Sequence, residues 1–358
     1  MKKKLQNKNF RTNLVTYASV TVAFIVMQLL SSMGILSSSI KGQLVPICAY
    51  IVLAVSLNLL VGICGELSLG HAGFMGIGAF TGMIIASLMT AHVGNKTLCL
   101  IVAMIVGGIM AGAIGFVVGI PVLRLKGDYL AIVTLAFGEI MKNFINNMYV
   151  ATDSKGFHFA ISTTKPEYAD NVKMIISGPL GATGVQKLST FAVGFGLIIF
   201  TLFVVLNLVN SKEGRAIKAI RDNRIAAESV GINVTAFRMK AFVVSAALAG
   251  MAGALFALNY SSLTASKFNF NTSINILVFV VLGGMGNILG SVISATVLYI
   301  LPEAMRGLDD LRMILYAVVL IVVMLFTWSP SVKNFSDRIK SYLREKFKKN
   351  RKEALNHE

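Results

Sequence analysis

The stretch GRAIKAIRDNRIAAESVGINVTAFRMK, residues 214–240, is basic and amphipathic, and it lies between two long apolar runs. These flanking runs, residues 188–211 and 241–266, contain no Asp, Glu, Lys or Arg. A helix needs about 20 apolar residues to cross roughly 30 Å of hydrocarbon. The sequence therefore predicts a charged, folded loop, residues 211–240, that connects two membrane spans.

The composition extends this interpretation to the whole chain. Of its 358 residues, 55% are apolar and only 14% are charged, against a usual charged share of about 25%. Further runs without Asp, Glu, Lys or Arg cover residues 12–40, 42–64, 67–95, 97–123, 268–302 and 313–332. None alternates as the strands of a membrane β-barrel do. We expect an all-α fold, a polytopic transmembrane helical bundle of about 8–10 membrane segments, some of them broken.

The net charge of +17 is concentrated in a few segments of the chain. Lys and Arg gather in residues 2–11, 124–126, 212–240 and 333–352. Such clustering is typical of cytoplasmic loops, which carry an excess of Lys and Arg, rather than of nucleic-acid binding, and it also favours anionic lipid. The expected division is a cytoplasmic N-terminus (1–11), a transmembrane domain (12–332) and a cytoplasmic tail (333–358). Residues 151–188, with mixed charge, are expected to form a polar outer stretch.

The run 268–302 presents a conflict in this topology. If this run and the last apolar run, residues 313–332, each crossed the membrane once, the basic tail would end outside the cell. That position would contradict the positive-inside rule. The conflict disappears if the run is a broken pair of helices that enters and leaves on the same side, interrupted at Gly283, Gly284 and Gly286. A second candidate break is residues 61–82. Broken backbone at membrane depth is tolerated where protein or a water-filled cavity covers it, so both breaks are candidate walls of a passage.

Both breaks contain the pattern G-x-x-G-x-apolar, at residues 62–67 and 283–288. Matching interruptions in two halves can mark the repeat axis of a transporter. They can equally serve close helix packing, and the two readings remain open. The pattern of small residues four apart at Ala246, Gly250 and Ala254, and the glycines of residues 107–119, predict closely packed helices.

The loop 211–240 is helical in pattern. Arg215, Lys218, Arg221 and Arg224 recur every three residues, and Lys218 with Asp222 and Arg224 with Glu228 are opposite charges four residues apart. Gly231 and Asn233 can end one helix, and a second short helix can follow into Arg238 and Lys240. Helices of this kind can dock in a groove of another protein or lie on lipid headgroups.

The chain contains no catalytic motif: there is no phosphate-binding G-x-x-x-x-G-K-[ST] loop, no HExxH and no GxSxG. We therefore expect no enzyme activity, no cofactor and no metal site in this chain. Cys48, Cys64 and Cys99 lie in apolar runs without metal-type spacing and are interpreted as packing residues.

The ionisable residues inside apolar segments are few. Glu66 and Asp128 are expected to cap helices, and Glu139 and Lys142 to neutralise each other. No chain of carboxylates suggests a proton relay, which disfavours an ion-coupled carrier without excluding it.

Four blocks of sequence carry a family resemblance: GICGELSLGHAGFMGIGAF (62–80), LRLKGDYLAIVTLAFGEI (123–140), the basic loop with the following span (214–255), and VVLGGMGNILGS (280–291). Their combination and order resemble the permease subunits of branched-chain amino-acid ABC importers of the LivM type. The resemblance implies a bacterial cell-membrane protein whose loop docks on an ATPase, with Ala226, Ala227, Glu228 and Gly231 at the core of the loop, and Arg215, Arg221 and Asp222 beside them.

The same resemblance implies partners: a second permease subunit, two cytoplasmic ATPase subunits that bind the ATP, and an extracytoplasmic amino-acid-binding protein. Related families move urea, short amides or sugars on a similar scaffold, and these substrates remain alternatives. For a leucine-like substrate, we expect the translocation path to be lined by Ser68, His71, Gly73, Phe74, Gly283, Gly284 and Gly286, with weak polar contacts that allow release.

Overall fold

In a computed structural model of the chain, the described residues are 2–34, 38–90, 93–125, 127–153, 156–162 and 173–304, with positions 314, 317, 318, 320 and 321. The chain divides into two compact units, residues 1–299 and 300–358, and the description below concerns the first. The basic tail, residues 333–358, and nearly all of the last apolar run, residues 313–332, lie outside the described residues.

Six helices in the described part of the chain contain a segment long and apolar enough to cross a membrane. They are α1 (Lys2–Ser32), α2 (Ser38–Asn58), α3 (His71–Met89), α4 (Lys96–Val122), α6 (Phe191–Asn210) and α9 (Val234–Ala257). Three further apolar helices are α5 (Asp128–Asn146), α10 (Phe270–Gly283) and α11 (Ile288–Ala304). The predicted fold class, a polytopic helical bundle with broken segments, is confirmed.

Small residues bring α3, α4 and α9 into close contact at the centre of the bundle. A Cβ on Gly78 of α3 would lie 2.0 Å from the Gly250 carbonyl oxygen of α9, and one on Gly115 of α4 would lie 2.7 Å from Ala246 Cβ. Because these contacts leave no room for a larger side chain, the predicted packing role of the small residues is confirmed.

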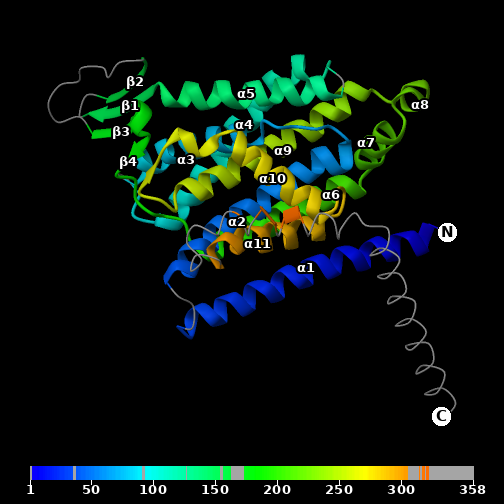
Figure 1. Ribbon diagram of the computed structural model, residues 1–358, viewed down its shortest axis with the longest axis horizontal. Coiled ribbons are helices and arrows are strands. Elements are labelled where there is room, and N and C mark those ends of the chain that lie inside the picture. The colour runs from blue at the N-terminus through cyan, green and yellow to red at the C-terminus, as the bar shows by residue number, and fades with distance from the viewer. Residues whose placement is uncertain are drawn as a thin grey trace, which may run out of the picture. The chain divides into compact units, whose positions relative to one another are not determined.

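A small antiparallel sheet closes one end of the bundle, at the left of Figure 1. Its strands are β1 (Met148–Asp153), β2 (Gly156–Ile161), β3 (Lys173–Ser177), β4 (Ala182–Thr183) and β5 (Ser262–Leu263), in the order β2-β1-β3-β4-β5. The sequence predicted only a polar stretch here. β4 and β5 were missed because they have two residues each, and the pairing of Ala182 with Leu263 joins segments far apart in the chain.

The second break is a tight turn between two antiparallel helices. Gly284 and Gly286, with φ of 89° and 83°, reverse the chain between α10 and α11. The ring of Tyr50 in α2 contacts both Phe279 of α10, at 6.0 Å, and Tyr299 of α11, at 4.7 Å. The two helices therefore run back along each other, and the predicted break of the run at Gly283–Gly286 is confirmed. That the pair enters and leaves the membrane on the same side stays a prediction.

The first break interrupts the chain between α2 and α3. The helix continues from α2 as a π-helical turn, η1 (Leu59–Cys64), and ends at Gly65, whose φ is 78°. Residues 65–70 are not helical. The break is therefore shorter than the predicted segment 61–82, because residues from His71 onward form α3.

Candidate functional site

At the end of the bundle opposite the sheet, the loop 211–240 folds into two short helices, α7 (Lys212–Asp222) and α8 (Arg224–Ser229), at the right of Figure 1. Each helix start is capped: Ser211 Oγ accepts from Gly214 N, Asn223 Oδ1 from Ala226 N, and Asn233 Oδ1 from Ala236 N. The sequence predicted one continuous helix through Arg221 and Arg224. Instead, α7 ends at Asp222, and Asn223 caps the start of the separate helix α8. The expected second short helix is also absent, because residues 234–240 are the first turns of α9.

The loop has a small core of its own. Ile220, Ala227 and Val234 are buried against one another, with Ile232 and Phe237 packed beside them. Two apolar side chains of the loop point outward instead: Ile225 is 79% exposed and Val230 is 74% exposed. Of the predicted coupling residues, Ala227 is buried, whereas the others are exposed: Arg215, Arg221, Asp222, Ala226, Glu228 and Gly231.

Of the two ion pairs predicted within the loop, the structure contains one and replaces the other. Arg224 Nε lies 3.0 Å from Glu228 Oε1, the expected pair four residues apart. The predicted pair of Lys218 with Asp222 is wrong, since Asp222 binds the neighbouring Arg221, with Nη2 at 3.0 Å from Oδ1. Partial burial lowers the pKa of Lys218 below its usual value, and the charge of Arg221 lowers it further.

Arg221 also connects α7 to the first break. Its Nη1 donates a hydrogen bond to the carbonyl oxygen of Gly62 at 2.9 Å. A Cβ on Gly65 would lie 2.7 Å from Arg221 Cγ, so the stem of the arginine packs directly on the backbone of the break. The loop is therefore attached to the segment that interrupts the second span.

The two breaks touch each other. A Cβ on Gly62 would lie 2.1 Å from the backbone nitrogen of Gly286, so the two G-x-x-G segments pack face to face. Asn58, at the end of α2, is fully buried and binds the second break through its side-chain amide. Sequence analysis missed Asn58, although a lone amide in an apolar run needs a partner at membrane depth and could have been singled out on that ground.

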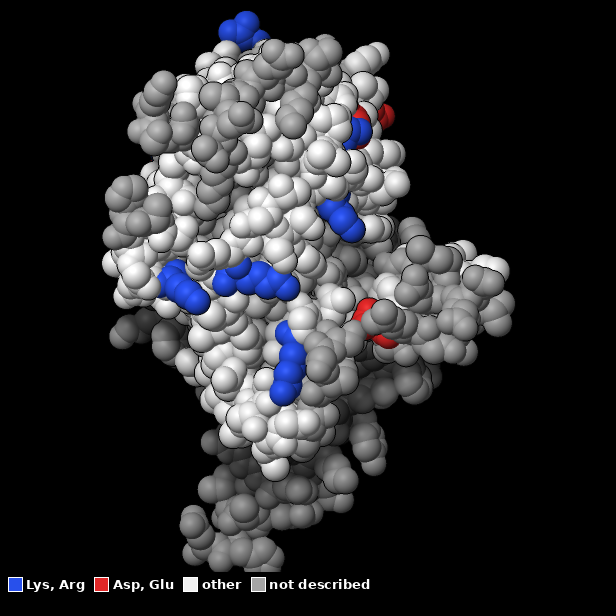
Figure 2. Space-filling view, turned by 90° about the vertical axis from the view of Figure 1, so that its left-hand side faces the viewer, with Lys and Arg blue, Asp and Glu red and all other residues white. Residues whose placement is uncertain are grey.

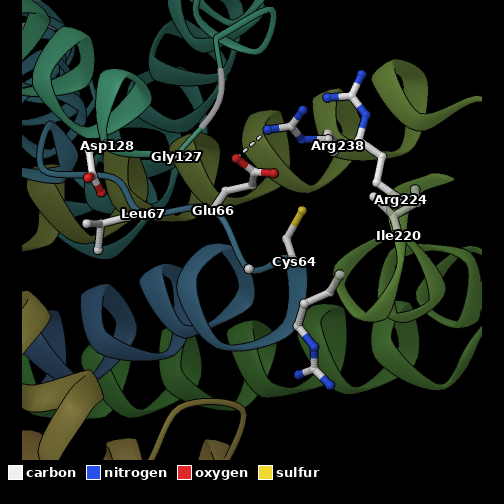
Figure 3. Close-up of a pocket in the computed structure, with 10 residues that line it drawn as sticks. Cys64, Glu66, Leu67, Gly127, Asp128, Ile220, Arg224 and Arg238 are labelled. Atoms are coloured by element: carbon white, nitrogen blue, oxygen red, sulfur yellow. Dashed lines mark ion pairs between the residues drawn. The ribbon is translucent and has the colours of Figure 1, made fainter.

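A cavity of about 450 Å³ lies between the first break, the start of α5, the helices α7 and α8, and the start of α9 (Figure 3). Glu66 and Arg238 form an ion pair at its wall, and Arg238 Nη1 also donates to the Leu123 carbonyl oxygen at 3.3 Å. Glu66 was expected to cap a helix, but the structure pairs it with Arg238, whose exposed fraction is 4%. Asp128 lies in the first turn of α5, where a negative charge is favourable.

The predicted path residues of the first break lie inside the chain. Ser68, His71, Gly73 and Phe74 are buried. His71 Nε2 lies 2.8 Å from Ser56 Oγ, and the ring of Phe74 packs between those of Phe137 and Phe242. In contrast, Gly283 and Gly284 are partly exposed and Gly286 is exposed. The structure thus brings Gly62 and Gly286 together but encloses Ser68, His71, Gly73 and Phe74. The assignment of the predicted residues of both breaks to a path stays a prediction.

Residues 39–326 match the family model described as the permease component of branched-chain amino acid transport systems. The chain belongs to this family. The matched residues of this chain include both breaks, the loop 211–240 and the residues that line the cavity. The whole candidate site therefore lies within the region that the family model covers.

Individual members of the permease family align over much of the chain. It is 35% identical over 292 residues to the high-affinity branched-chain amino acid transport system permease protein LivM of Escherichia coli K12, covering 78% of this chain and 66% of that protein. It is 24% identical over 250 residues to LivH of Salmonella typhimurium, covering 70% of this chain and 79% of that protein. No solved structure gives a significant match.

Proposed function

We propose that this chain is the membrane-spanning permease subunit of an ATP-binding-cassette importer, and that it moves Leu, Ile and Val across a bacterial cell membrane. Its family and the names of its relatives support this substrate class. The sequence has no phosphate-binding loop, so separate ATPase subunits must supply the energy.

The observation that carries the proposal is the pair of short helices α7 and α8. They present Ile225 and Val230, both well exposed, amid charged side chains, while Arg221 bonds the same loop to the first break. Exposed apolar residues surrounded by charges are typical of a protein docking surface. Force applied to this loop by an ATPase would therefore reach the broken membrane segments directly.

The orientation follows from charge. The end that carries α7, α8 and the start of α9 holds Arg215, Arg221, Arg224, Arg238 and Lys240. Among the described residues, the sheet end shows scattered Lys and Arg and a few acidic side chains on a mostly uncharged face (Figure 2). By the positive-inside rule the α7–α8 end is cytoplasmic, and the sheet faces outward toward an external amino-acid-binding protein.

The path itself is proposed to form with a second permease subunit. The second break lies at the surface of this chain, where Gly286 is exposed, so another subunit can complete a passage there. The external binding protein would select the amino acid, and the path would hold it only weakly so that it is released.

The test is copurification followed by uptake in liposomes. The chain is expressed with candidate ATPase subunits and a candidate second permease, and leucine uptake is measured with and without ATP. Ile225→Asp with Val230→Asp should abolish copurification of the ATPases and ATP-driven uptake. Leu180→Asp is the matched control, because Leu180 is 71% exposed at the sheet end, and it should leave the ATPases bound. Leucine uptake that proceeds without any ATPase would overturn the proposal.

A further inference from the structure

Asn58 joins two segments that lie more than half the chain apart. Its Oδ1 accepts a hydrogen bond from Gly286 N at 2.7 Å, and its Nδ2 donates to the Asn287 carbonyl oxygen at 3.1 Å and to Ser291 Oγ at 2.8 Å. Gly286 N can only donate and the Asn287 carbonyl can only accept. The amide therefore has a single orientation that satisfies its partners, and it fixes the position of the second break against the end of α2.

Gly62 is the other contact of this junction. Its carbonyl oxygen accepts the bond from Arg221, and a Cβ at this position would lie 1.9 Å from Asn58 Oδ1. Only glycine allows the two breaks and the arginine to meet. Gly62 also lies in the π-helical turn η1, and single π-turns within helices are frequent at functional sites.

We propose that these contacts form a clasp, made of Asn58, Gly62, Arg221, Gly286 and Ser291, which ties both breaks to α7 so that they move with it as one unit. Asn58 is the positioning residue that holds the two breaks together, and Arg221 is the link to α7. Asp222 holds the remaining guanidinium nitrogens, with Nε at 3.2 Å and Nη2 at 3.0 Å from Oδ1, and so aims Nη1 at Gly62.

The clasp suits mechanical transmission because the buried side chain of Asn58 has no substitute for these partners. Asn58 and Ser291 are fully buried, and a buried amide that loses its partners is left unpaired at a high cost in free energy. Separating the breaks would cost the buried Asn58 its bonds to Gly286 N, the Asn287 carbonyl oxygen and Ser291 Oγ together. Moving them together leaves every bond intact, so a displacement of α7 favours joint movement. The inference rests on the proposed function, since the ATPase is what would displace α7.

The first test compares Asn58→Ala with Asn269→Ala in the complete importer in liposomes. Asn269 is the matched control because it caps α10 at its far end, with Oδ1 at 3.0 Å from Thr272 N, and takes no part in the clasp. Asn58→Ala should lower leucine uptake per ATP hydrolysed by about tenfold, since lost hydrogen bonds to buried groups are costly. Asn269→Ala should leave that ratio unchanged, and Ser291→Ala, which loses one bond of Asn58, should be intermediate.

The ratio of leucine uptake to ATP hydrolysis distinguishes a loss of coupling between α7 and the breaks from a simple loss of protein stability. Uptake and ATP hydrolysis that fall in parallel in Asn58→Ala, or a ratio equal to that of Asn269→Ala, would overturn the clasp. If Asn58→Ala does not assemble, Ser291→Ala decides in the same way, and an unchanged ratio in that variant counts against the proposal.

Hydrogen exchange in the intact complex distinguishes failure of the clasp from failure of the proposed function. On ATP binding, amides of residues 59–65 and 284–290 should change exchange rate together in the natural sequence, and only residues 59–65 should respond in Asn58→Ala. A joint response that persists in Asn58→Ala refutes the clasp alone. A complex in which no ATPase is bound and neither segment responds to ATP refutes the proposed function, and the clasp with it.

Discussion

Arg238 carries a positive charge at the edge of the bundle with only 4% of its surface exposed. Its guanidinium is held by Glu66 of the first break and by the Leu123 carbonyl oxygen at the end of α4. A buried charge that loses its partner is expensive, whereas an exposed pair contributes little. At the residue scale, this ion pair is therefore the strongest single electrostatic constraint on the cavity wall.

Glu66→Gln should lower the free energy of unfolding by about 3–5 kcal/mol, because it leaves the buried Arg238 without its carboxylate. The loss is measured as a lower melting temperature of the detergent-purified chain. Glu228→Gln is the control, since it removes the carboxylate of an exposed pair, with side chains 40% and 49% exposed, and should cost less than about 1 kcal/mol. Equal melting temperatures for the two variants would contradict this assignment.

At the scale of elements, backbone contact between helices decides how α3, α4 and α9 pack. Gly78 meets the backbone of Gly250, and Gly107 meets the backbone of Gly78 in turn, with a Cβ there at 2.8 Å from its carbonyl oxygen. Since lipid is as apolar as leucine, such close packing replaces the hydrophobic effect as the main attraction between spans.

Gly78→Ala should separate α3 from α9 and destabilise the chain by about 1–3 kcal/mol, the usual cost of overpacking. The matched variant is Gly196→Ala in α6, where a Cβ would meet nothing within 4 Å and a better helix former should be neutral or slightly stabilising. Thermal unfolding in detergent compares the two. The packing model fails if Gly78→Ala melts no earlier than Gly196→Ala.

On the scale of the whole molecule, the hairpin of α10 and α11 sets which parts of the chain share a side of the membrane. Its turn contacts the first break beside α7, and its helices lead back toward Tyr50 and the sheet end. The turn and α8 should therefore face the same compartment, and the sheet the opposite one.

Single cysteines at Ile225, Met285 and Leu180, all more than half exposed, test this arrangement after the buried Cys48, Cys64 and Cys99 are replaced by alanine. The chain is expressed without ATPases, and vesicles of both orientations are treated with a membrane-impermeant maleimide. Cysteines at Ile225 and Met285 should react only from the cytoplasmic side, and the one at Leu180 only from outside. Labelling of Met285→Cys from the same side as Leu180→Cys would rule out the hairpin.

Three features were predictable from the amino-acid sequence: the class of the protein, the break at Gly283–Gly286 and the helical nature of the loop 211–240. These features depend on local properties: the length of apolar runs, the weakness of glycine in helices, and the clustering of Lys and Arg. The close packing of the face with Ala246, Gly250 and Ala254 was also foreseeable, since residues spaced four apart share a helix face.

Which distant residues meet depends on the folded arrangement of the helices and could not be predicted. Asn58 with Gly286, Arg221 with Gly62, Glu66 with Arg238, and Ala182 with Leu263 are all partners from separate segments. No periodicity within one helix encodes such pairs, because each partner is chosen by the packing of whole helices, and a side-chain hydrogen bond follows only once two backbones already lie within a few ångströms.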